Sequence, residues 1–251
     1  MPAAYDSYDY PSYWENREYE HKSELIALKS LLGKIPDIDT VLEIGTGFGR
    51  LVPTYSYRAR KIILSDPSAR LLSLARQTYK EAKNIKYIHS SLENLPSKIK
   101  KGSVDTIVMV RVIHHLENIK TAFETMYRLL AGGGYVILEF ANKKHLKAII
   151  SEIWKGNLTF PIDIIPKDLS SKKSKKKGAL PFINYHPEAL IAQLTEIGFT
   201  PVEKLSVSNI RSTFLKRVFS LESLLKIETI LQKPFGYLNF GPSIFVLLRK
   251  T

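Results

Sequence analysis

Three glycines at alternate positions follow an apolar stretch in Val41-Leu-Glu-Ile-Gly-Thr-Gly-Phe-Gly-Arg50. Glycine tolerates positive φ and lets the backbone approach a ligand closely. The segment after the glycines is expected to be a helix with free N–H groups at its start. A dinucleotide fingerprint has the spacing G-x-G-x-x-G, whereas the third glycine here comes one residue early. Glu43 would repel a pyrophosphate and suits a cationic amine. The alternative interpretation is a structural tight turn.

Asp66 ends the next apolar stretch and is the second candidate binding residue. An acidic side chain at the tip of a second strand can accept both hydroxyl groups of a ribose. The alternative is that Asp66 caps a helix over residues 67–79, because Asp before Pro is a helix start signal.

Three histidines are candidate general bases, because imidazole titrates near neutral pH. His114 and His115 follow the fourth apolar stretch, and His186 lies in Asn184-Tyr-His-Pro187. The alternative for His114 and His115 is a structural role, in which they cap the start of a helix and pack against their neighbours. The six histidines of the chain show no H-x-E or H-E-x-x-H spacing, so no metal site is expected.

Short runs rich in Val, Ile and Leu, without polar alternation, predict parallel strands buried on both faces. These runs are Thr40–Ile44, Lys61–Ser65, Ile85–His89, Val104–Val110 and Gly134–Phe140. An apolar stripe from Ile119 to Leu130 predicts a helix that Gly132–Gly134 ends. Alternating strands and helices imply a parallel sheet covered on both sides, with right-handed crossovers.

Further elements are expected on either side of this alternating region. Helices are expected at Ser23–Leu32, Lys144–Trp154, Pro187–Ile197 (with Gly198 just past its end) and Ser212–Leu231, and strands at Pro201–Val207 and Ser243–Leu248. The helical segment 212–231 either completes the core or covers a lipophilic pocket. The first of these is the favoured interpretation.

The chain has 251 residues, no cysteine and a formal net charge of +13. The absence of cysteine excludes disulfides, thiolate catalysis, iron–sulfur clusters and Cys-ligated zinc. The longest apolar runs are about five residues, far short of a membrane span, and the start of the chain lacks the apolar core of a signal peptide. A soluble, cytoplasmic protein without a transmembrane segment is therefore expected.

Part of the positive charge is concentrated in the run Lys172-Lys-Ser-Lys-Lys-Lys177. The favoured interpretation is a solvated loop. The alternatives are contact with RNA phosphates or an anionic membrane surface, and recognition of an anionic small substrate.

Five sequence pieces together resemble the class I S-adenosylmethionine-dependent methyltransferases. They are L-E-I-G-T-G-F-G, S-D-P-S, S-L-E-N-L-P, V-D-T-I-V-M-V-R-V-I-H-H-L and R-L-L-A-G-G-G, in the family's order and spacing. The resemblance covers about residues 37–141 and is weaker over 186–251. It implies an α/β fold with a Rossmann-like, doubly wound, seven-stranded and mostly parallel sheet. The last strand would be antiparallel, in a three-layer α/β/α arrangement spanning residues 1–251 as one domain.

The resemblance also implies S-adenosyl-L-methionine as cofactor and a set of binding residues. Glu43 would lie near the ammonium group, with the backbone of Gly45, Thr46 and Gly47 holding the methionine moiety. Asp66 would bind the ribose, Ser91 and Leu92 would flank the adenine, and Arg111 would lie close to the sulfonium. Many relatives have Asp where Ser91 stands, so the adenine contact here departs from the family pattern.

Residues outside the cofactor-binding core (37–141) are expected to close the site. In an N-terminal aromatic cap (1–36), Arg17 would pair with the cofactor carboxylate and Tyr13 would line the substrate pocket. The alternative is an aromatic arm packed on the sheet edge. Residues 142–185 would form a substrate lid that contributes Tyr185, and residues 186–251 would supply the C-terminal half of the sheet.

The predicted function is methyl transfer to a small or lipophilic molecule. This chemistry asks mainly for alignment of nucleophile, methyl carbon and sulfur, and orientation alone can supply roughly 7–11 kcal/mol. A base is needed only where the nucleophile must lose a proton. The alternatives are an RNA or protein methyltransferase that uses the basic surface, with nucleic acid the less favoured partner, and a non-catalytic S-adenosylmethionine-binding protein. A nicotinamide-dependent oxidoreductase is disfavoured by Glu43 and by the early third glycine.

Overall fold

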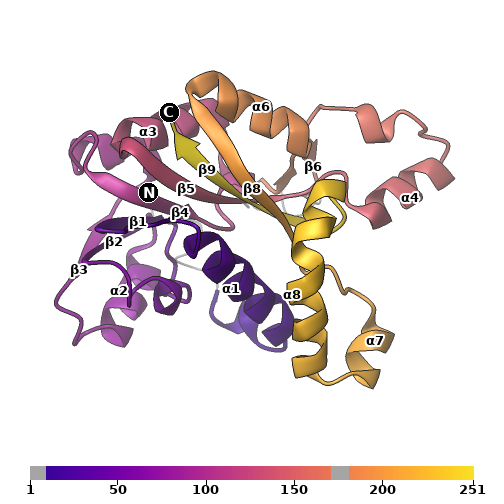
Figure 1. The fold of residues 1–251 in the computed structure, drawn as a ribbon, viewed down its shortest axis with the longest axis horizontal. Coiled ribbons are helices and arrows are strands. Elements are labelled where there is room, and N and C mark those ends of the chain that lie inside the picture. Colours follow the sequence, from indigo (N-terminus) through magenta and orange to yellow (C-terminus); the bar gives the residue numbers. More distant parts are fainter. Residues whose placement is uncertain (1–9, 171–180) are drawn as a thin grey trace.

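A seven-stranded sheet runs through the computed structural model, which describes residues 10–170 and 181–251 (Figure 1). Its strand order is β3-β2-β1-β4-β5-β9-β8. The strands are β1 (Thr40–Ile44), β2 (Lys61–Asp66), β3 (Ile85–His89), β4 (Val104–Met109), β5 (Leu130–Ala141), β8 (Phe199–Val207) and β9 (Ser243–Lys250). β9 is antiparallel to both of its neighbours, and the pairs from β3 to β5 are parallel. The predicted fold class, with its antiparallel last strand, is confirmed.

Helices cover both faces of this sheet. The α-helices of the described residues are α1 (Glu18–Leu32), α2 (Ala69–Thr78), α3 (Ile119–Leu129), α4 (Leu146–Trp154), α6 (Pro187–Ile197), α7 (Thr213–Val218) and α8 (Leu221–Leu238), of which α4 and α7 do not pack on the sheet. One core cluster joins the sheet to α3 and α6, and a second joins its other face to α1 and α2. β1 is buried at every position, which explains why its apolar residues do not alternate with exposed polar ones. β6 (Lys167–Asp168) and β7 (Ile183–Asn184) form a separate two-stranded antiparallel sheet.

The three glycines at 132–134 do not end helix α3, contrary to the prediction. The helix stops at Leu129, and the glycines lie inside β5. A Cβ atom on Gly134 would come within 2.9 Å of the carbonyl oxygen of Asp105 in β4. The pairing register of β4 and β5 shifts at this point. Glycine is therefore required by the close approach of two strands.

No α-helix follows the glycines at 45–49, which corrects a second prediction. The chain continues in turns and a three-residue 3-10 helix, η3 (Val52–Thr54), with Pro at its start. A helix this short lacks the row of free N–H groups that a pyrophosphate would use. The N–H groups of Gly45, Thr46 and Gly47 instead donate to oxygen atoms of β2.

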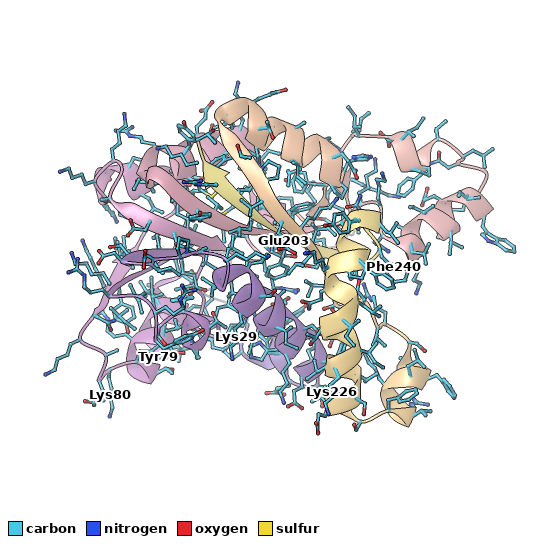
Figure 2. All side chains as sticks on the ribbon, viewed as in Figure 1. Lys29, Tyr79, Lys80, Glu203, Lys226 and Phe240 are labelled. Atoms are coloured by element: carbon cyan, nitrogen blue, oxygen red, sulfur yellow. The ribbon has the colours of Figure 1, made fainter. Side chains whose placement is uncertain are left out.

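The segment predicted as helical over 212–231 forms two helices of different character. α7 buries none of its side chains, so it does not complete the core. α8 packs against α1 and β8, and a Cβ atom on its Gly236 would come within 2.2 Å of the Lys204 carbonyl oxygen. Glu203 of β8, which is labelled in Figure 2, forms salt bridges with Lys34 at 2.5 Å and with Lys233 at 3.3 Å.

A buried carboxylate fixes α8 to the rest of the molecule. Glu228 is fully buried and accepts hydrogen bonds from the Tyr19 hydroxyl at 2.6 Å and the Ser208 N–H at 2.8 Å. Burial raises the pKa of Glu228. Among the described residues, no helix is long and apolar enough to cross a membrane.

Candidate functional site

The glycine loop (residues 45–49) joins the end of β1 to the following turns. Gly45 has φ +71° and Gly47 has φ +57°, the left-handed region that favours glycine. A Cβ atom on Gly45 would lie 2.3 Å from Cγ2 of Val112. The N–H groups of Gly45 and Thr46 donate to the Ser65 carbonyl at 2.8 and 3.1 Å. The loop is thus bare main chain, fixed against the end of β2.

Asp66 holds the glycine loop and the start of α2 together. Its Oδ2 accepts from the Gly47 N–H at 2.7 Å, and its Oδ1 accepts from the Ser68 N–H at 2.8 Å. Ser68 is the N-cap of α2, because its hydroxyl accepts from the Leu71 N–H. The alternative interpretation of Asp66 as the helix cap is therefore wrong.

Glu43 is buried in β1, directly before the loop. The Tyr55 hydroxyl donates a hydrogen bond to its carboxylate. Burial raises the pKa of Glu43 to about 7, although the hydrogen bond from Tyr55 and the charge of Arg50 oppose the rise. A cation placed beside this carboxylate would favour its ionised form.

Arg111 follows β4 with φ +61°, which is unusual for a residue with a side chain. Its backbone N–H donates to Oε2 of the buried Glu139 at 2.7 Å. Its guanidinium donates to Glu24 at 2.9 Å and to the Tyr13 hydroxyl at 2.7 Å. Glu24 also accepts from Arg50 at 2.5 Å. Their positive charges hold the pKa of Glu24 below its usual range despite burial.

Aromatic residues of the N-terminal cap cover the glycine loop. The Tyr10 ring packs edge-on against Phe48, with ring centroids 6.0 Å apart. Its Cε1 lies 3.4 Å from the place a Cβ atom of Gly47 would take. The Arg50 guanidinium lies 3.9 Å from the centre of the Trp14 ring. Arg17 is exposed and lies over the Tyr13 ring at 4.3 Å. The cap lies over the loop, so the alternative of an arm on the sheet edge does not describe residues 10–17.

The histidine pair lies in the loop between β4 and α3 and contacts Pro181 and Phe182 of the predicted lid. The rings of His114 and His115 are 4.1 Å apart, and Phe182 lies 4.6 Å from His114. The His115 Nδ1 lies 2.7 Å from the Pro181 carbonyl oxygen. Burial, followed by the neighbouring charges, lowers the pKa of His114 well below its ordinary value. The lid residue Tyr185 donates to the Ile113 carbonyl at 3.3 Å, and burial raises its pKa to about 12.

The remaining candidates lie apart from this cluster. His186 precedes α6, with Nδ1 3.2 Å from Glu188 Oε2 and Nε2 3.4 Å from the Pro161 carbonyl. Ser91 begins the 3-10 helix η4 (Leu92–Ser97), where its hydroxyl accepts from Asn94 at 3.2 Å. Leu92 is buried beside it. The lysine run 172–177 lies outside the described residues.

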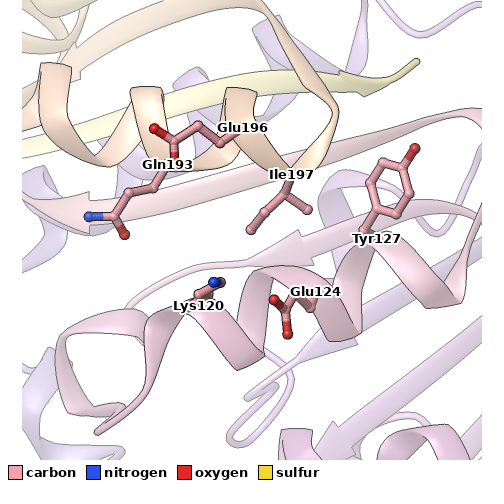
Figure 3. Close-up of a pocket in the computed structure, with 6 residues that line it drawn as sticks. All are labelled: Lys120, Glu124, Tyr127, Gln193, Glu196 and Ile197. Carbon is pink, nitrogen blue, oxygen red and sulfur yellow. The ribbon is translucent and has the colours of Figure 1, made fainter.

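Two hollows flank helix α6. One, of about 260 Å³, lies between the lid and α6 and is mainly apolar; it is lined by Ile164, Ile165, Pro166, Tyr185, His186, Ala189, Leu190 and Gln193. The other is a polar groove between α3 and α6 (Figure 3), lined by Lys120, Glu124, Tyr127, Gln193, Glu196 and Ile197. Only the first includes residues predicted to contact substrate or to act as a base.

Three residues of the site were missed in the sequence. Glu24 and Tyr55 act through partners on other elements, and spacing alone does not reveal such pairs. Glu139 did leave a signal, because it is a carboxylate inside an apolar strand run. Within the residues that the structure describes, no group of His, Asp and Glu is arranged to hold a metal ion.

Comparisons with known proteins agree with this geometry. A family model described as "Methyltransferase domain" matches residues 42–138. The tRNA 5-carboxymethoxyuridine methyltransferase of Escherichia coli is 26% identical over 218 residues, 84% of this chain and 79% of that protein. The ubiquinone/menaquinone biosynthesis C-methyltransferase UbiE of Coxiella burnetii is 25% identical over 168 residues, 63% of this chain and 66% of that protein.

Solved structures share the fold. A Thermotoga maritima structure, described as an S-adenosylmethionine-dependent methyltransferase and possible histamine N-methyltransferase, has a TM-score of 0.67 and 21% identity over 99% of both chains. The N-methyltransferase NodS of Bradyrhizobium japonicum, in complex with S-adenosyl-L-homocysteine, has a TM-score of 0.59 and 17% identity, covering 98% of this chain and 94% of that one.

Proposed function

Because this chain is a class I S-adenosylmethionine-dependent methyltransferase, we propose that it methylates a small or lipophilic molecule. The observation that carries the proposal is the apolar and aromatic character of the lid side of the site. Phe182 packs on His114, and isoleucines line the adjoining hollow of about 260 Å³. Such surroundings favour an acceptor with little charge.

The residues of the glycine loop and its neighbours fit this cofactor. The buried carboxylates of Glu43 and Asp66 flank the loop and supply the acceptors that an ammonium group and a ribose require. The bound cofactor supplies an electrophilic methyl group on its sulfonium. The residues proposed to hold it are Arg17, Glu43, Gly45, Thr46, Gly47, Asp66, Ser91, Leu92 and Arg111. For Arg17 this requires its side chain to leave the Tyr13 ring.

Each proposed contact follows from the charge or hydrogen-bonding capacity of the side chain. Glu43 binds the ammonium group in its ionised form, and the Asp66 carboxylate accepts hydrogen bonds from the ribose hydroxyls. The Glu24 carboxylate keeps the Arg111 side chain in place beside the reacting centre. The N-terminal cap, with Tyr13 at the acceptor side, excludes water from it.

His114 is the best placed of the three candidate bases. Its ring is buried beside Phe182, and the Nδ1 atom has no hydrogen-bond partner among the described residues. A neutral imidazole in this position can take a proton from an acceptor hydroxyl or amine. His115 and His186 are each engaged with a backbone carbonyl of the lid segment.

The second candidate function is methylation of RNA. It is favoured by the 26% identity to a tRNA methyltransferase and by the net charge of +13. The test is to incubate the purified protein and labelled S-adenosylmethionine with separate lipid, small-molecule and RNA fractions of its source cells. Label in the lipid or small-molecule fraction is expected. Label confined to RNA would establish the second candidate, and binding without label in any fraction would favour a non-catalytic protein.

A further inference from the structure

We propose that helices α4 and α7 dock this enzyme on an anionic lipid surface. Neither helix buries a single side chain. Their large apolar residues point to solvent and form what we call the apolar face: Leu146, Ile150, Ile153, Trp154, Phe214, Leu215, Val218 and Phe219. Large exposed apolar patches on a folded protein mark interaction surfaces.

The two helices lie on the same side of the molecule. Helix α8 lies between them and the sheet, so both are at the right of Figure 1. The Leu146 N–H, at the start of α4, donates to the carbonyl of Phe240, just past the end of α8, at 3.0 Å. Burial and then the charge of Arg211 lower the pKa of His145, so the start of α4 lies near the segment that leads into α7.

The apolar residues form a regular stripe and include aromatic rings. In α4 the exposed positions Leu146, Ile150, Ile153 and Trp154 follow helical periodicity. Trp154 is 86% exposed and Phe214 of α7 is 70% exposed. Helices that combine such a stripe with basic residues lie in the interface between lipid headgroups and acyl chains.

The charges around the apolar face complement an anionic surface. From residue 204 to residue 221 the chain has no Asp or Glu and four basic residues. Within the described part of the chain, Arg211, Arg217 and Lys147 make no ion pair. Each basic residue near a membrane of anionic lipid adds electrostatic attraction.

Other occupants fit these residues less well. RNA binds through its phosphates and through bases that stack on aromatic rings, whereas five of the eight residues of the apolar face are aliphatic and provide neither charge nor a stacking surface. A second copy docked by two-fold symmetry would bring two surfaces of the same positive charge together, because such an interface pairs the same patch of both copies. A lipid surface accommodates both the apolar and the basic residues.

The test is vesicle binding by the full chain. Phosphatidylcholine vesicles with and without phosphatidylglycerol are mixed with the protein and separated by sedimentation. We expect binding to the anionic vesicles and much less to the neutral ones. The fluorescence of Trp154 should shift to shorter wavelength, and Trp154→Phe should remove that shift and leave the signal of Trp14.

Two variants and a matched control separate docking from folding. Phe214→Ser combined with Phe219→Ser should weaken binding by about tenfold or more, since each ring loses its contact with lipid. Arg211→Gln with Arg217→Gln should remove the preference for anionic vesicles. Tyr57→Ser, at an equally exposed aromatic residue outside the apolar face, should change nothing.

The proposal is overturned by three results. In the first, the wild-type protein does not bind anionic vesicles. In the second, the α7 variants bind vesicles as tightly as the wild type does. In the third, sedimentation velocity shows that the wild type is an oligomer and that the α7 variants are not. The last result would identify a second copy as the occupant. Binding of S-adenosylmethionine, measured by calorimetry on the same variants, should be unchanged, so this test does not depend on the proposed acceptor.

Discussion

The backbone N–H of Arg111 and the carboxylate of Glu139 are joined by a hydrogen bond of 2.7 Å across the ends of β4 and β5. Arg111 has φ +61°, and Glu139 receives a second hydrogen bond from Ser243 of β9 at 2.6 Å. The uncommon backbone geometry at the tip of β4 is therefore held by a buried side chain from the neighbouring strand.

Glu139→Ala should destabilise the protein and disturb the site. The change leaves the Arg111 N–H without its acceptor in a buried place, which costs about 1–3 kcal/mol in the free energy of unfolding. Urea unfolding measures the loss. Ser243→Ala, which spares the bond to Arg111, is the control and should cost less. Equal stability of Glu139→Ala and wild type would contradict the assigned role.

Glu43 predicts a pH-dependent stability with a defined sign. Its pKa of about 7 in the folded protein exceeds the ordinary value of 4.5, so between these pH values the folded state holds a proton that the unfolded chain releases. This contribution is complete below pH 4.5 and is lost as pH rises to 7, a decrease of about 3 kcal/mol. Glu43→Gln should lack it, as shown by unfolding curves for both proteins across this range.

The same carboxyl group predicts the pH dependence of cofactor binding. If the ionised form of Glu43 binds the ammonium group, affinity should fall about tenfold for each pH unit below 7. In Glu43→Gln the affinity should be weaker and nearly constant from pH 5.5 to pH 8. Calorimetry at several pH values checks this, and parallel curves for the two proteins would remove Glu43 from the ammonium site.

Asp66→Ala should weaken binding of S-adenosylmethionine by roughly 1.5–3 kcal/mol, the range for hydrogen bonds to a charged group. The variant also loses the bonds to the Gly47 and Ser68 N–H groups, so its stability must be measured beside its affinity. Ser68→Ala serves as the control for the start of α2. Unchanged affinity of Asp66→Ala in calorimetry would exclude the proposed ribose contact.

The contribution of His114 to stability changes with pH in the opposite direction to that of Glu43. Burial lowers its pKa below the ordinary 6.5, so on acidification the unfolded chain takes up a proton before the folded protein does. Its share of stability is present above pH 6.5 and is lost as pH falls. His114→Phe should flatten this part of the curve, compared with wild type at each pH. A curve of unchanged slope would show that the ring is accessible to protons.

Tyr10→Ala should speed the exchange of the cofactor. The ring covers Gly47 and packs 6.3 Å from Trp14, whose fluorescence can report on the cap. Both association and dissociation of S-adenosylmethionine in stopped-flow experiments should become faster. Ser12→Ala, at an exposed residue of the same cap, is the control. Rates equal to the wild type would show that the cofactor enters by another path.

The sequence predicted those elements whose own residues determine them. Thr40–Ile44, Ile85–His89 and Pro187–Ile197 were predicted with the boundaries observed, because apolar runs and flanking Pro and Gly define them locally. The predictions failed at 132–134 and after residue 49. At 132–134, the close approach of strand β4 requires the glycine at position 134, and the end of the helix does not. After residue 49 no helix forms, and the glycine loop is held by Asp66.

The candidate site was predictable in its main chain and less so in its side chains. The glycine loop and Asp66 are consecutive features of two strands, and the structure brings them together with a hydrogen bond. The Glu24 carboxylate between Arg50 and Arg111 depends on the docking of α1 over the loop. Contacts between such distant segments leave no periodic signal in a single sequence.

The position of β9 has a consequence for synthesis on the ribosome. β9 follows both of its partner strands in the chain, and it pairs with β5 on one side and β8 on the other. Until it has emerged from the ribosome, the nascent chain has an unpaired edge at β5, and such an edge invites association with other chains. Chaperones that shield exposed strand edges should therefore stay bound to the growing polypeptide until this eight-residue strand has paired.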